Sequence, residues 1–185
     1  MTNRYITSHF PLISIVLFSL SLAIYVQGLI LDALVDMGIF SGMLEFISEN
    51  GIKLTLLFLL LLCFFMIFSA LKLIADTTIE LSMLFFSKDE EGTELSKARA
   101  GSWIFLVASI ASLLVANYIL IIVALILLAN FVYFVYLIYK VSDALSFSGL
   151  VGFIFFQVFF WGAFVISIGY ALIRLYNSFM ASLPI

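Results

Sequence analysis

The chain has 185 residues, of which 65% are hydrophobic and only 10% are charged, and its formal net charge is −3. Soluble domains carry about 25% charged residues, so this composition excludes a soluble fold, which could not bury so much apolar surface. We expect one all-α domain over residues 1–185, a transmembrane helix bundle surrounded by the lipid bilayer and without a nucleic-acid partner.

The first predicted helix covers about residues 10–31, an apolar run that is long enough to cross a membrane and too long for a signal peptide. We therefore expect it to be retained. The second predicted helix covers about residues 52–86. Its span is expected at about 52–75, because the chain is uncharged from 54 to 71, and its charged remainder is expected to extend into the cytoplasm.

The segment between these two helices is acidic. Asp32 and Asp36 are four residues apart, a spacing that places both on one helix face, where they could concentrate cations at the mouth of a pore. The alternative is a plain acidic loop outside the cell. Apolar residues recur at helical spacing from Phe40 to Ile47, which predicts a short interfacial helix.

The 39 residues from Gly101 to Tyr139 contain no Asp, Glu, Lys, Arg or His. As a single helix this run would be about 58 Å long, roughly twice the thickness of a bilayer core. We predict two helices, at about 102–116 and 119–139, separated by a turn at Asn117, because Asn tolerates the backbone geometry of tight turns.

The last predicted helix covers about residues 148–174. The count is then five spans, and one continuous helix through Asn117 would reduce it to four. With either count, six Lys and Arg residues fall on the side of the N-terminus and two on the other side. The positive-inside rule therefore places the N-terminus and the 72–101 loop in the cytoplasm.

Four polar or amphipathic side chains fall inside the predicted spans, where such groups need partners. They are Gln27, Asn130, Gln157 and Trp161. One interpretation is that they face a polar path across the membrane. The other is that they join helices by hydrogen bonds, helped by small residues that let helices approach closely.

Lys72, Asp76 and Glu80 are spaced four residues apart at the end of the second span, so they share one helix face. This face is a candidate cytoplasmic gate or a docking surface for another protein. The simpler interpretation, which the sequence favours, is a solvated helix end, since exposed ion pairs of this kind contribute only about 0.3–0.5 kcal/mol.

The sequence contains no pattern typical of catalysis or of a cofactor. The chain has one His and one Cys, and its spans hold no cluster of His, Cys, Asp or Glu of the kind that catalytic sites need. We therefore expect no metal site, no cofactor and no enzymatic activity.

Four stretches of the chain resemble a known family. They are residues 9–15 (HFPLISI), 71–76 (LKLIAD), 84–89 (LFFSKD) and 177–185 (NSFMASLPI). In these stretches the chain is similar to the YufK family, small uncharacterised membrane proteins of Gram-positive bacilli. The resemblance implies a multi-pass protein of the bacterial cytoplasmic membrane. It implies no known reaction and no catalytic residue.

Two functions remain open at this point. One is a channel or transporter for an ion or small solute, working as a homo-oligomer, most simply a dimer, because one small protomer offers few pore-lining faces. The other is a non-catalytic membrane adaptor or assembly factor, which would dock a partner membrane protein through the cytoplasmic extension of the second helix.

Overall fold

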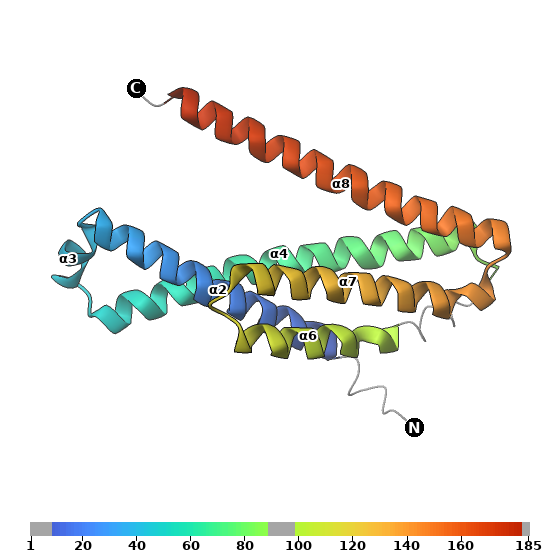
Figure 1. Ribbon diagram of the computed structural model, residues 1–185, viewed down its shortest axis with the longest axis horizontal. Helices are drawn as coiled ribbons and strands as arrows, with labels where there is room; N and C mark the ends of the chain where they lie inside the picture. The colour runs from blue at the N-terminus through green and yellow to red at the C-terminus, as the bar shows by residue number, and fades with distance from the viewer. Residues whose placement is uncertain (1–8, 89–98, 183–185) are drawn as a thin grey trace.

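The structure is a computed structural model that describes residues 9–88 and 99–182. In chain order its helices are α2 (Phe10–Asp36), α3 (Ile39–Leu44), α4 (Glu49–Phe86), η1 (Arg99–Ser102), α6 (Trp103–Leu114), α7 (Ile119–Val141), η2 (Ser142–Ala144) and α8 (Phe147–Ser182) (Figure 1). In the described ranges, α2, α4, the helix from Ile119 to Ala144, and α8 are long and apolar enough to cross a membrane. The expected all-α membrane bundle is confirmed. The expected cytoplasmic loop 72–101 falls partly on residues 89–98, which lie outside the described residues.

The helices α2, α3 and α4 form a long antiparallel hairpin, in which α3 connects α2 to α4 (Figure 1). Gly38 has φ +70° between α2 and α3, a left-handed conformation that favours glycine. Ser48 caps α4 by accepting a 3.2 Å hydrogen bond from the N–H of Gly51. Further along the hairpin, the Phe18 and Phe68 rings lie 6.2 Å apart. With 38 residues, α4 is about 57 Å long.

A second, shorter hairpin consists of α6 and α7, and its turn contains Asn117. With only 12 residues, α6 is about 18 Å long, too short to cross a 30 Å hydrocarbon core alone. The Phe105 and Tyr133 rings pack at 5.1 Å within this hairpin. The hydroxyls of Ser21 and Ser112 are 2.8 Å apart and join α6 to α2.

Within residues 9–88 and 99–182, the last helix, α8, packs on other helices only near its beginning. A core cluster unites α4, α7 and α8 there and consists of Ile79, Met83, Leu137, Val141 and Phe153. The Phe86 ring fills the space beside Gly152, where an added Cβ would meet it at 2.5 Å. Beyond Gln157 no residue of α8 is buried, and the helix diverges from α4 (Figure 1).

Candidate functional site

The core cluster determines how α4 and α7 are aligned along the bundle. Both helices run in the same direction (Figure 1), and Ile79 of α4 shares this cluster with Leu137 of α7. Lys72 precedes Ile79 by seven residues, and Asn130 precedes Leu137 by seven. Because both helices rise equally per residue, Lys72 lies at about the level of Asn130, near the middle of α7.

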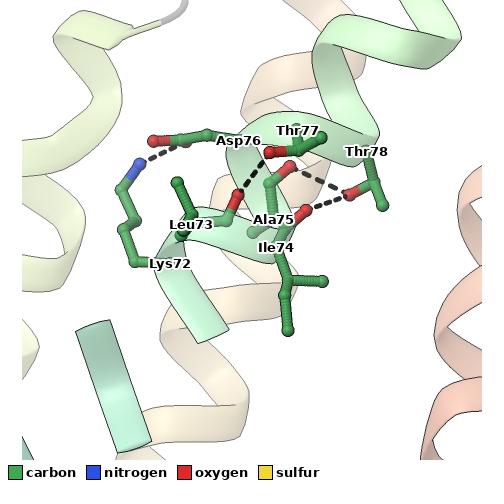
Figure 2. A network of polar contacts seen from close by, with 7 residues as sticks. All are labelled: Lys72, Leu73, Ile74, Ala75, Asp76, Thr77 and Thr78. Atoms are coloured by element: carbon green, nitrogen blue, oxygen red, sulfur yellow. Dashed lines mark hydrogen bonds and ion pairs between the residues drawn. The ribbon is translucent and has the colours of Figure 1, made fainter. Parts of the chain in front are cut away.

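Lys72 and Asp76 form an ion pair at this level of α4, and their side chains are 36% and 40% exposed. Figure 2 shows that both leave α4 on the opposite side from Thr78. The Thr78 hydroxyl is buried and donates to the carbonyls of Ile74 and Ala75, each at 2.9 Å. The pair therefore lies on a partly exposed face of α4, whereas Thr78, on the opposite side, is buried. Glu80 is exposed one turn further along.

The second polar contact on α4 is closed. The Gln157 amide donates a 3.0 Å hydrogen bond to the Ser82 hydroxyl, and that hydroxyl donates to the Ile79 carbonyl at 2.9 Å. Gln157 is only 2% exposed and Ser82 is fully buried. This amide therefore joins α8 to α4.

Gln27 lies at the other end of α4. Its amide donates a 2.7 Å hydrogen bond to the Lys53 carbonyl, and the Lys53 ammonium pairs with Glu49 at 2.5 Å. Gln27 thus closes the α2–α4 hairpin near α3. Its partner Lys53 and Ser82 are 29 residues apart in α4, which is about 43 Å along the helix.

The other predicted residues also stay apart. Asn130 is exposed, and its amide bonds the Ile126 carbonyl of its own helix at 2.8 Å. The Trp161 ring contacts Phe160 and Phe164, also in its own helix, at 5.7 and 5.5 Å. The polar residues predicted to lie within the spans therefore do not converge on one site.

Asp32 and Asp36 are exposed at the end of α2. Neither forms an ion pair with another residue in the ranges 9–88 and 99–182. Within the same ranges, no three His, Cys, Asp or Glu side chains are grouped as metal ligands would be. The two carboxylates lie at the α3 end of the bundle, far from Lys72 and Asp76.

Hollows in the described surface lie away from these contacts. One of about 550 Å³ runs along α8 between Tyr170 and Ala181 and includes Arg174. Another, of about 440 Å³, lies on α7 between Phe131 and Tyr139. Neither is lined by Lys72 or Asp76, whose side chains are partly exposed at the surface of the protomer.

Sequence reasoning missed two contacts between helices, Ser82 with Gln157 and Ser21 with Ser112. Each serine lies in an apolar run in which several serines look alike. The only available signal was that a buried amide such as Gln157 needs a hydrogen-bond partner.

Comparison with known proteins agrees with the resemblance seen in the sequence. Residues 27–184 match a family described as a family of unknown function (DUF5366). The chain is 46% identical, over 185 residues and the full length of both chains, to the "Uncharacterized membrane protein YufK" of Bacillus subtilis (strain 168). No solved structure matches. The chain therefore belongs to this family of uncharacterised membrane proteins.

Proposed function

We propose that the protein is a channel or transporter for an ion or small solute, and that the Lys72–Asp76 pair lies in its path. The observation that carries this proposal is the half-exposed ion pair at the level of the middle of α7. Charged residues inside membrane spans are rare. They usually pair with one another, face the bundle interior or a wet cavity, and belong to ion, proton or substrate pathways.

The depth of the pair follows from α7. Tyr118 and Lys140 are 22 residues apart, about 33 Å of helix, and both are residue types that favour membrane interfaces. The Lys140 ammonium lies over the Tyr136 and Tyr139 rings at 5.8 and 5.6 Å. If α7 crosses the bilayer between these ends, Lys72 lies near the midplane and Asp76 about 6 Å from it.

The last helix gives a second position for the bilayer centre, ten residues further along α4 than the first. Residues 144–173 are uncharged, and Gln157, near the middle of that stretch, contacts Ser82. Centring the bilayer on this contact places Asp76, six residues from Ser82, about 9 Å from the midplane. With either centre, Asp76 would lie on one side or the other of the midplane but within the hydrocarbon core, whereas the sequence predicted a cytoplasmic extension of this helix.

The ion pair opens onto the surroundings of α4, so a complete path needs more than one protomer. A second protomer related by two-fold symmetry would place two such faces around one axis. We therefore propose a homodimer as the smallest transporting unit. This is the simplest assembly in which the half-exposed pair becomes the lining of a path.

Flux into proteoliposomes tests the proposal. The purified protein should carry at least one of K⁺, Na⁺, H⁺ or Cl⁻ faster than empty liposomes. Asp76→Asn should reduce that flux at least tenfold, because it leaves Lys72 without its counter-charge. Glu49→Gln is the matched control, since it disrupts the other described ion pair with the same spacing, and it should leave the flux within twofold.

Two results would contradict the transport proposal. One is a wild-type flux that equals the flux of empty liposomes for all four ions. The other is a measurable flux that Asp76→Asn leaves unchanged.

A second candidate, the membrane adaptor, is favoured by a different observation. From residue 158 to 182 no side chain of α8 is buried, so this half of the helix is available to another membrane helix. A photo-crosslinker at Val165 should then give one discrete adduct in cells. The same crosslinker at Phe131 of α7, where the side chain is equally exposed, should give only lipid adducts. Lipid adducts at both positions would argue against the adaptor.

A further inference from the structure

The α2–α3–α4 hairpin projects well beyond the α6–α7 turn (Figure 1). Ser21 of α2 contacts Ser112, near the end of α6. From Ser21, α2 continues for 15 more residues to Asp36, which is about 22 Å. We call this projecting part, residues 27–58, the hairpin tip.

Apolar side chains of the hairpin tip are exposed on α2, on α4 and on the segment between them. Exposed apolar residues of this segment include Leu29, Val35, Phe46, Leu54 and Phe58. An exposed apolar surface is ordinary where lipid covers it, and it marks an interaction site where water would otherwise meet it. The position of the bilayer therefore decides how this surface is interpreted.

The depth derived from α7 places much of the hairpin tip outside the bilayer. Phe58 and Leu54 precede Lys72 by 14 and 18 residues, about 21 and 27 Å along α4. Half of a bilayer, headgroups included, is about 20–22 Å thick. Leu54 thus lies beyond the headgroups, and centring the bilayer on Ser82 instead moves it further out.

The charge of the hairpin tip limits what can cover it. The tip carries Asp32, Asp36, Glu45 and Glu49 against one base, Lys53, which is already paired with Glu49. In a two-fold dimer built on this surface the acidic patch would meet its own copy, and like charges brought together oppose association. A second copy of this chain is therefore disfavoured, whereas a cationic partner is complementary.

We propose that the hairpin tip is a docking surface for a cationic amphipathic helix of another protein, on the outer side of the membrane. The apolar face of such a helix would pack on the exposed apolar residues of α2 and α4. Its Lys and Arg residues would pair with the acidic residues of the hairpin tip. This site goes beyond transport. The proposal rests on the bilayer position derived for the proposed function, but the docking itself does not depend on transport.

A designed peptide pair tests the proposal on the full-length protein in nanodiscs of zwitterionic lipid. One peptide is an 18-residue amphipathic helix of Leu and Lys, and the other has Glu in place of Lys. The Lys peptide should bind protein-loaded nanodiscs at least tenfold more tightly than empty ones, and the Glu peptide should not. The combined variant Asp32→Asn with Asp36→Asn should weaken binding about fivefold, and Phe58→Ser should weaken it as well.

Asp143→Asn is the matched control, because Asp143 is exposed at the opposite end of the bundle, and it should leave binding unchanged. Three outcomes overturn the proposal. They are equal binding of the Lys and Glu peptides, equal binding to empty nanodiscs, and a combined Asp variant that binds as tightly as wild type. Because peptide binding is measured without ion flux, its failure is distinct from failure of the transport proposal.

Discussion

Two polar contacts on the same helix, ten residues apart, have opposite surroundings. Ser82 is fully buried and meets Gln157 in the packed contact between α4 and α8. Lys72 and Asp76 are more than one-third exposed. The difference separates two uses of polar groups in a membrane bundle, because a closed contact joins helices whereas a half-open ion pair remains accessible to ions and water.

The largest expected effect comes from breaking the open pair. Asp76→Leu should destabilise the protein by about 3 kcal/mol, because it leaves the Lys72 ammonium unpaired at hydrocarbon depth. The combined variant Lys72→Leu with Asp76→Leu should recover most of that loss, since no lone charge remains. Denaturation in detergent micelles measures both. A loss below about 1 kcal/mol for Asp76→Leu would show that the pair lies in water.

The next effect comes from opening the closed contact. An added Cβ on Gly149 would meet the Phe86 carbonyl oxygen at 2.7 Å, and a backbone atom cannot yield as a flexible side chain can. Gly149→Leu should therefore cost about 2 kcal/mol through overpacking. Denaturation in detergent micelles measures this loss.

Gly169→Leu serves as the control for this substitution, because nothing lies within 4 Å of a Cβ built there. It should leave the stability unchanged. If Gly149→Leu and Gly169→Leu behaved alike, the described packing between α4 and α8 would be wrong.

A smaller effect distinguishes the two contacts by function. Gln157→Leu should cost about 1 kcal/mol, since hydrogen bonds between membrane helices contribute about 0.6–1.7 kcal/mol. The ion flux per folded protein should not change, because this amide is buried and bonded to Ser82. A flux reduced as far as by Asp76→Asn would place both contacts in one path and remove the distinction between them.

The smallest effect is expected at the α3 end. Lys53 and Glu49 have the same four-residue spacing as Lys72 and Asp76, and both are well exposed. Glu49→Gln should therefore change the stability by less than about 0.5 kcal/mol. A loss comparable to that of Asp76→Leu would mean that spacing alone, without depth, determines what an ion pair contributes here.

The sequence predicted the helical class of this protein well, because uncharged runs of spanning length have one common outcome in a bilayer. It also indicated that Gln157 needs a partner. It did not indicate which helix supplies that partner, since lipid-facing and helix-facing positions are similarly apolar in a membrane protein. Ser82 is one of many serines and carries no distinguishing pattern.

The depth of Lys72 was hard to predict for a related reason. The uncharged stretch 54–71 ends directly before it, so hydropathy alone places Lys72 at the membrane surface. The core cluster that contains Ile79 and Leu137 aligns α4 with α7, and the different depth proposed above rests on this alignment. Such alignment depends on the packing of particular side chains between helices, which the order of apolar residues does not encode.

The depth of α4 is the central claim, and spin labels on its exposed face test it most directly. Leu54, Leu73 and Leu84 have similar exposed fractions of 67%, 68% and 75%, so each label can report its surroundings. Power saturation with oxygen and with a water-soluble nickel complex measures the depth of each label in liposomes. We predict that the labels at positions 73 and 84 both lie deeper than the label at position 54, which lies on the aqueous side. A depth maximum near position 62, with 54 and 73 equally shallow, would contradict the intramembrane ion pair.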